Sequence, residues 1–208
     1  MERSLTRGTG LIYSLCDRSL RALEPWAAAG FTCVAYDILP PLRSLPGVVH
    51  VQADVRQVAG LPYAAFVMAW PPCTHLALSG ARHWAGKGPG LALEAVQIVE
   101  ACRRLAGDAP LLLENPHGRL KKFWRAPDKV VQPWHFAGWS GPEDAYQKAT
   151  CLWLENGALA PAESRWVGEI DKHRVAMAGQ TKGRATARSL TPLGLARAIY
   201  EANRPLAE

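Results

Sequence analysis

The chain has 208 residues, of which 49% are hydrophobic and 20% charged. This ordinary globular composition predicts a single domain over residues 1–208. Its five cysteines are odd in number and widely spaced, with no Cys-x-x-Cys pair, which argues against a disulfide framework or a zinc knuckle. We therefore expect a reduced protein and no bound metal.

No apolar signal segment opens the sequence, and no run of about 18 apolar residues occurs in it. A cytoplasmic protein with no membrane partner is the expectation. The net charge of +6 and the isoelectric point near 9.2 favour a polyanionic partner.

In the first half of the chain, short apolar runs alternate with amphipathic stretches. This pattern predicts βα units and a mostly parallel α/β sheet, doubly wound with helices on both faces. Helices are predicted at residues 22–29 and 91–106. The predicted strands occupy residues 11–15, 32–36, 48–51, 65–70 and 111–113.

Beyond residue 120 the pattern weakens, because aromatic residues are scattered among prolines, glycines and basic residues. A strand is predicted at residues 150–154, in a hairpin. The last helix is predicted at residues 191–202, with Thr191 as its cap and Pro192 at its first position.

Polar or reactive side chains stand at four of the predicted strand ends: Asp37, Asp54, Cys73 and Glu114. Ligands of open α/β sheets bind in the crevice at the carboxyl ends of the strands. These four side chains therefore mark the candidate site.

Pro71 and Pro72 hold Cys73 just beyond a strand, where a thiol is directed into a cleft. The alternative is that this cysteine packs as a small apolar residue. Glu114 ends the next strand, and adjacent strands lie about 4.8 Å apart, so the carboxylate and the thiol can meet over one small substrate. Glu114 can equally pair with Arg119.

These elements, in this order, resemble the DNA cytosine-5 methyltransferases, in particular the short forms of bacteriophages. Pro71-Pro72-Cys73 with Ser79-Gly80 is similar to the nucleophile motif of that family, and Glu114-Asn115-Pro116 to its Glu-Asn motif. Residues 147–153 and 188–192 are similar to later family motifs. The resemblance implies a Rossmann-like methyltransferase fold with a reduced or absent target-recognition domain, and the host cytoplasm if a phage encodes the chain.

The resemblance also implies a mechanism. Cys73, presented by Pro72, would add to carbon six of cytosine, which makes carbon five nucleophilic toward a one-carbon donor. Glu114, oriented by Asn115, would hydrogen-bond the ring and stabilise the developing charge. Because this carbon is inaccessible in a duplex, the base would be flipped out or the strand would be single.

The implied donor is S-adenosylmethionine, with Asp37 and Asp54 where the family contacts its ribose and adenine. Asp17 and Ser19 match the donor loop of the phage forms, which have glycine where this chain has Leu20. Residues 16–21 hold no glycine and two arginines, so a different donor stays open. Either arginine would pair with the carboxylate of a carboxylated adenosylmethionine or of methylene-tetrahydrofolate, and the folate would give hydroxymethylcytosine.

The partner that the resemblance implies is DNA. Lys148, Arg82 or Arg188 would supply charge that larger relatives provide by arginines at the positions of Ala149 and Cys151, and Thr150 is also predicted to bind the substrate. Residues 155–188 are interpreted as a reduced DNA-contact insertion, which predicts short-context or nonspecific modification.

A basic, aromatic stretch at residues 119–125 and a second basic cluster at residues 182–188 are open to two interpretations. They contact phosphates beside the site, or they form solvated loops whose aromatic rings pack on the core. A catalytically inactive DNA-binding protein on the same fold is the alternative function.

Overall fold

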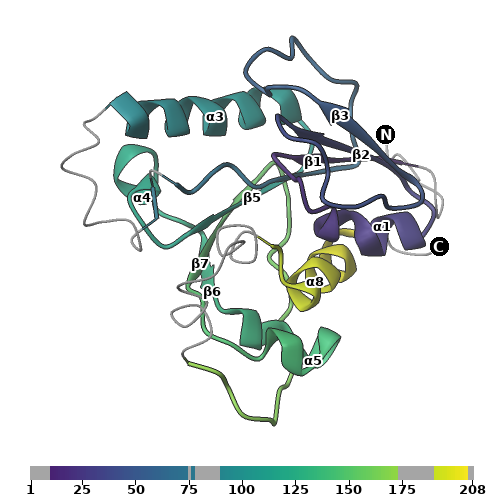
Figure 1. Cartoon of the computed structure of the whole chain (residues 1–208), viewed down its shortest axis with the longest axis vertical. Coiled ribbons are helices and arrows are strands. Elements are labelled where there is room, and N and C mark those ends of the chain that lie inside the picture. Colours follow the sequence, from purple (N-terminus) through teal and green to yellow (C-terminus); the bar gives the residue numbers. More distant parts are fainter. Residues whose placement is uncertain (1–9, 75, 78–89, 173–189, 206–208) are drawn as a thin grey trace.

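The computed structural model describes residues 10–74, 76–77, 90–172 and 190–205, and a seven-stranded sheet of order β3-β2-β1-β4-β5-β7-β6 forms its centre (Figure 1). The first five strands along the chain are parallel, and β7 runs antiparallel between β5 and β6. This confirms the predicted mostly parallel α/β fold. The strands are β1 (Leu11–Leu15), β2 (Thr32–Asp37), β3 (Val48–Gln52), β4 (Phe66–Ala69), β5 (Leu111–Pro116), β6 (Lys129–Val131) and β7 (Thr150–Glu155).

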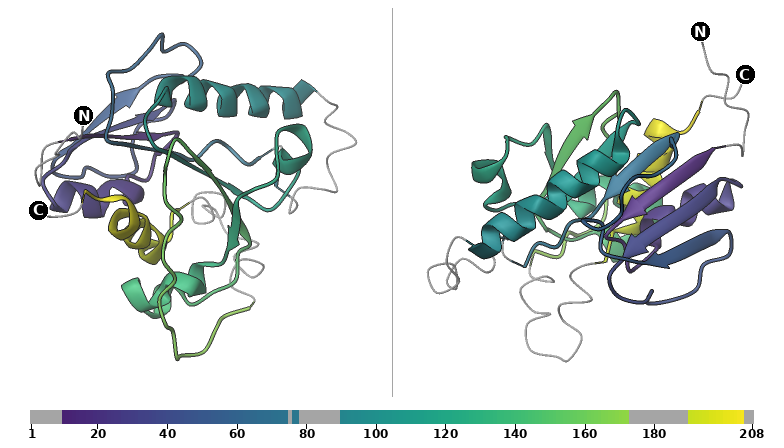
Figure 2. Two further views of the ribbon diagram at one scale, coloured as in Figure 1. Left: turned by 180° about the vertical axis from the view of Figure 1, so that it is seen from behind. Right: turned by 90° about the horizontal axis from the view of Figure 1, so that it is seen from above.

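Helices cover both faces of the sheet (Figure 2). On one face lies α3 (Gly90–Ala106), and on the other lie α1 (Glu24–Ala28) and α8 (Leu193–Asn203). Trp26 of α1 is fully buried and stacks on Phe66 of β4, with ring centroids 5.4 Å apart. Because the central strands are buried on both sides, their sequences are continuous apolar runs rather than alternating ones.

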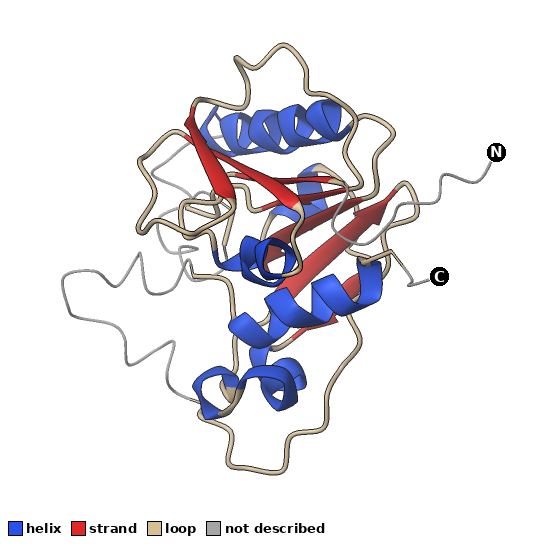
Figure 3. Ribbon diagram, turned by 90° about the vertical axis from the view of Figure 1, so that its right-hand side faces the viewer, coloured by secondary structure: helices blue, strands red, loops and turns tan. Residues whose placement is uncertain are grey.

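A chain of short elements follows β5. It comprises α4 (Leu120–Phe123), η3 (Pro133–Phe136), α5 (Ala137–Ser140) and η4 (Pro142–Asp144). Figure 3 shows the helical segments of residues 133–144 and α8 on one side of the strands and the long α3 on the other. The short α4 lies on the α3 side, where Leu120 and Trp124 join the same core cluster as α3. None of the short elements was predicted, because each is too brief to show a periodic pattern.

The predicted cap of the last helix is wrong. The helix begins at Leu193, two residues later than expected, with Pro192 at the N-cap position. The buried carboxylate of Asp144 accepts the Gly194 N–H at 2.6 Å and the Ser140 hydroxyl at 2.7 Å. The capping group therefore comes from fifty positions upstream, where no local sequence signal points to it.

Other element boundaries also differ from the predicted ones. The predicted helix over residues 22–29 begins as a 3-10 turn, η1 (Arg21–Leu23), before α1. β5 extends to Pro116 because β7 pairs with it along its whole length, so Glu114 and Asn115 lie within the strand rather than after it. The strand predicted at residues 150–154 is β7, and its hairpin partner is β6.

After β7, residues 156–172 contain no helix or strand. They pack on η3 and on α8 through hydrogen bonds, from the Ser164 N–H to the His135 carbonyl at 2.7 Å and from the Leu159 N–H to Asn203 Oδ1 at 2.7 Å. The rest of the predicted DNA-contact insertion lies outside the described residues. Within the described ranges, no helix has the length and apolar character needed to span a membrane.

Candidate active site

Cys73 stands in a tight turn just beyond β4. The two prolines before it lack the N–H that would continue the parallel ladder, so the chain leaves the sheet there. The Cys73 carbonyl accepts the N–H groups of Leu76 at 3.0 Å and Ala77 at 2.8 Å. Pro71 is buried and Pro72 exposed, while the cysteine itself is half-buried.

Asn115 ties this turn to the neighbouring strand. Its side chain is fully buried, and Nδ2 donates to the Pro71 carbonyl at 2.8 Å. Its Oδ1 is buried as well and has no hydrogen-bond partner among the described residues. A hydrogen bond therefore joins the Pro-Pro-Cys segment directly to the Glu-Asn segment, the two segments that the sequence predicted to form the site.

A close backbone approach forms the second tie between the turn and β5. Ala77 and Gly118 form an isolated antiparallel bridge, and the Arg119 N–H donates to the Leu76 carbonyl at 2.7 Å. A Cβ added at Gly118 would lie 2.0 Å from that carbonyl oxygen. Only glycine leaves room for the turn at this distance.

Glu114 is half-buried in β5, on the sheet face opposite to Asn115. Burial raises the pKa of its carboxyl group, while the positive charge of Lys148 and a hydrogen bond with Thr150 act in the opposite direction. Two of the predicted substrate-binding residues thus lie beside Glu114. The raised pKa extends to higher pH the range in which this carboxyl group is protonated and can donate a hydrogen bond.

Four of the five cysteines are placed as packing residues. Cys33, Cys102 and Cys151 are buried, and Cys16 Sγ lies 4.0 Å from Cys102 Sγ. Burial raises the pKa of Cys33 to about 12 and that of Cys151 to about 11, and contact with Cys102 together with burial raises the pKa of Cys16. Because the thiolate is the reactive form, Cys16, Cys33 and Cys151 are poor nucleophiles at neutral pH.

The loop after β1 is organised by Asp17. Its buried carboxylate accepts hydrogen bonds from the Ser14 hydroxyl, the Ser19 N–H, the Ser19 hydroxyl and the Leu20 N–H, all between 2.8 and 3.0 Å. Asp17 and Ser19 therefore fix the conformation of this loop by hydrogen bonds within it.

The same loop has the backbone of a glycine-containing turn without the glycine. Cys16 has φ 59° and Leu20 has φ 61°, both in the left-handed region. Leu20 occupies the position where the resemblance leads one to expect glycine, and its side chain is 2% exposed. The left-handed turn is thus present, with a leucine anchored in the core.

A link that sequence reasoning missed joins this loop to β4. Trp70 Nε1 donates to Ser14 Oγ at 3.0 Å, and Ser14 Oγ donates to Asp17 Oδ2 at 2.8 Å. A signal was available, because Ser14 is the one polar side chain in the otherwise apolar run of β1. The residue just before the Pro-Pro-Cys turn is therefore connected to the loop after β1.

The two acids at the ends of β2 and β3 have different environments. Asp37 is half-buried, and Oδ1 accepts the Leu39 N–H at 2.9 Å. Burial raises its pKa. Asp54 receives two hydrogen bonds from the Arg56 guanidinium, at 2.6 and 3.0 Å, and these lower its pKa. Of the two, Asp37 has the carboxylate more available to a ligand.

Several predicted residues fall outside the described part of the chain, namely Ser79, Gly80, Arg82, Arg188 and the basic cluster at residues 182–188. Where the structure describes the chain, no three His, Cys, Asp or Glu side chains are grouped to hold a metal ion.

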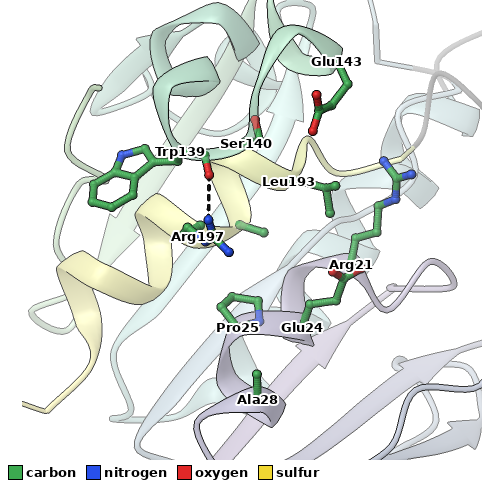
Figure 4. Close-up of a pocket in the computed structure, with 10 residues that line it drawn as sticks. Arg21, Glu24, Pro25, Ala28, Trp139, Ser140, Glu143, Leu193 and Arg197 are labelled. Atoms are coloured by element: carbon green, nitrogen blue, oxygen red, sulfur yellow. Dashed lines mark hydrogen bonds between the residues drawn. The ribbon is translucent and has the colours of Figure 1, made fainter. Parts of the chain in front are cut away.

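A pocket of about 260 Å³ lies between α1, α5 and α8 (Figure 4). Its polar rim includes Arg21, Glu24 and Glu143, and Arg197 donates to the Trp139 carbonyl at 2.8 Å beside it. None of the residues predicted to be catalytic lines it.

No protein-family model and no curated protein sequence matches this chain. Among solved structures, it is similar to the N-methyltransferase NodS of Bradyrhizobium japonicum, with 10% identity and a TM-score of 0.39 over 71% of this chain and 86% of NodS. A 1,6-didemethyltoxoflavin-N1-methyltransferase of Burkholderia thailandensis, with bound S-adenosylhomocysteine, gives 11% identity and a TM-score of 0.32 over 60% of this chain. This chain spans 50% of the length of that enzyme.

The glycopeptide N-methyltransferase MtfA gives 13% identity and a TM-score of 0.31, over 70% of this chain and 65% of MtfA. Scores and identities of this size assign no activity. The function is therefore argued from the residues of this chain.

Gly118→Ala is expected to destabilise the protein by about 1–3 kcal/mol or more, because the new methyl group overlaps the Leu76 carbonyl. Urea unfolding measures the loss. Gly60→Ala is the matched control, since a Cβ there meets nothing within 4 Å. Equal stability of the two variants would contradict the close approach.

Glu114→Gln should change the pH dependence of stability. The raised pKa means that ionising Glu114 costs folding free energy as the pH rises above the ordinary value of 4.5. The free energy of unfolding of Glu114→Gln, relative to the native chain, should therefore increase from acid toward neutral pH. The exposed Asp108→Asn is the control, and a flat or falling difference for Glu114→Gln would contradict the buried environment.

Proposed function

We propose that this chain is a methyltransferase that modifies carbon five of cytosine in DNA, with S-adenosylmethionine as donor. Cys73 is the nucleophile and Glu114 its electrostatic partner. Lys148 and Thr150 support Glu114, and Asn115 holds the nucleophile turn in place.

The observation that carries the proposal is the hydrogen bond from Asn115 to the Pro71 carbonyl. It fixes a half-exposed cysteine, two residues beyond Pro71, relative to a carboxyl group of raised pKa, one residue before Asn115. Addition to cytosine needs a nucleophile and a proton-donating carboxyl group on one ring, and this tie supports such an arrangement.

Bond making and breaking follow from these two side chains. The Cys73 thiolate forms a bond to carbon six, and the electron pair of the double bond between carbons five and six becomes available at carbon five. Glu114 in its protonated form donates to ring nitrogen three and stabilises the charge that the addition creates. After transfer, carbon five loses its proton to a base, and the bond from Sγ to carbon six breaks to restore the thiolate.

The residues around the loop after β1 are compatible with S-adenosylmethionine as the donor. Asp37 ends β2 with a half-buried carboxylate, the position from which an acid accepts ribose hydroxyls in this class of fold. The left-handed residues Cys16 and Leu20 give the loop the course that lets backbone approach a ligand. When bound, the donor supplies an electrophilic methyl group and leaves as S-adenosylhomocysteine.

A trapping experiment tests the nucleophile. An oligonucleotide with 5-fluorocytosine should form a denaturant-stable adduct in the presence of donor, because fluorine cannot leave carbon five as the proton does. Cys73→Ala should abolish the adduct, Glu114→Gln should slow it by roughly 100-fold or more, and the buried Cys33→Ala should retain it. If the native chain forms no adduct with any donor but binds DNA, the inactive DNA-binding alternative holds.

Product analysis tests the donor. DNA incubated with S-adenosylmethionine alone should yield 5-methylcytosine by nucleoside mass spectrometry, and Asp37→Asn should raise the KM for the donor by roughly tenfold or more. Formation of 5-hydroxymethylcytosine with methylene-tetrahydrofolate only, or product with carboxylated adenosylmethionine only, would replace the proposed donor by that one.

A further inference from the structure

The basic stretch at residues 119–125 divides into two sides with different environments. Leu120 is buried at 1% exposure, and Trp124 packs on Trp153 with ring centroids 5.6 Å apart. Arg103 and Arg125 lie over the Trp124 ring at 5.3 and 5.1 Å. This side of α4 belongs to the core and explains why a tryptophan stands there.

The arginines on that side are also neutralised. Glu155 lies 2.9 Å from Arg103 and 3.8 Å from Arg125, and Asp128 lies 2.9 Å from Arg125. Their charges are therefore matched by carboxylates of β7 and of the loop before β6. A polyanion gains little by binding there, since it would compete with these acids.

The outer side of α4 is different. Phe123 remains 45% exposed, and the Arg119 guanidinium lies 4.9 Å from the centre of its ring. Lys121 and Lys122 are exposed in the same short helix, and residues 117–124 include no acid. Lys121 Nζ donates to His117 Nε2 at 3.1 Å, which holds this ammonium group against the start of α4.

This outer side is fixed relative to Cys73. The Arg119 N–H binds the Leu76 carbonyl, and the Leu76 N–H binds the Cys73 carbonyl. Phe123 follows Arg119 by one helical turn, a rise of about 5–6 Å. In Figure 1, α4 follows the carboxyl end of β5.

We propose that the outer side of α4 binds single-stranded DNA, with a base stacked on Phe123 and the phosphates on either side contacting Arg119, Lys121 and Lys122. An exposed aromatic ring next to an arginine, on a short helix that carries two further exposed cations, is a combination that single-strand binding uses. Every base has a face that can stack, and every linkage carries a charge. The bases of a duplex are already stacked on each other, so this surface favours the single strand. The inference rests on the proposed function in that the bound strand is taken to be the substrate.

The test is binding without chemistry. Fluorescence anisotropy with a labelled mixed-sequence oligonucleotide, single-stranded or annealed to its complement, is measured in the absence of donor. The native chain should bind the single strand more tightly than the duplex. Phe123→Ala should weaken single-strand binding by roughly 5- to 100-fold, whereas Phe123→Trp should retain it.

Charge and aromatic controls separate stacking from general attraction. Lys122→Gln should lower the slope of log affinity against log salt by about one, because one phosphate contact is lost. Tyr63→Ala removes another exposed aromatic residue, 61% exposed and ahead of the opposite end of β4, and should bind as the native chain does.

Native affinity in Phe123→Ala, or equal or tighter binding of the duplex, would overturn the inference. So would a native chain that binds no single strand. Repeating the measurement with Cys73→Ala keeps the two proposals apart, since strand binding should persist when adduct formation is lost. Conversely, intact adduct formation with unchanged binding by Phe123→Ala would remove only this inference.

Discussion

The candidate site depends on one hydrogen bond, from Asn115 Nδ2 to the Pro71 carbonyl, because backbone pairing between β4 and β5 ends before it reaches the site. The ladder between these strands stops at Ala69 and Leu113. Beyond that point the Asn115 side chain makes the next contact, and the backbones meet again at Leu76 and Arg119. A single hydrogen bond contributes only about 1 kcal/mol net, but losing one partner would leave a buried amide or carbonyl unsatisfied at greater cost. Precise placement of the Cys73 turn is thus coupled to the folding of β5.

The loop after β1 adopts a left-handed turn although it contains no glycine. Two non-glycine residues in this conformation cost roughly 1–2 kcal/mol each. Burial of the Leu20 side chain and the four hydrogen bonds accepted by Asp17 offset that cost. The missing glycine therefore does not by itself imply a different loop or a different ligand. Since Trp70 and Ser14 connect the same carboxylate to the end of β4, one hydrogen-bond network supports both the loop after β1 and the start of the Pro-Pro-Cys turn.

Elements whose formation depends on neighbouring residues in the chain were predicted correctly from the sequence. The five parallel strands and the long helix follow from apolar runs and a 3.6-residue period, and the clustering of strand ends follows from parallel order. Prediction failed where a partner distant in sequence decides the outcome. β5 reaches Pro116 only because β7 pairs with it, and α8 begins at Leu193 only because Asp144 caps it. The internal role of Asp17 likewise depends on tertiary contacts, although Ser14, a polar residue in an apolar strand, was a readable sign of it.

Net charge alone could not say where a polyanion binds, because many cations of this chain are already engaged. Arg56 binds Asp54, Arg104 donates to the carbonyls of residues 55, 58 and 59, and Arg103 and Arg125 share Glu155. Because the opposite charges of such ion pairs largely cancel, they contribute little electrostatic field to the surrounding surface. The stretch at residues 117–124, by contrast, contains three cations and no acid, and backbone hydrogen bonds through Leu76 connect it to the Cys73 turn. Under the proposed function, positive charge concentrated in this stretch would steer an anionic strand toward the candidate site more effectively than the same charge spread over the surface.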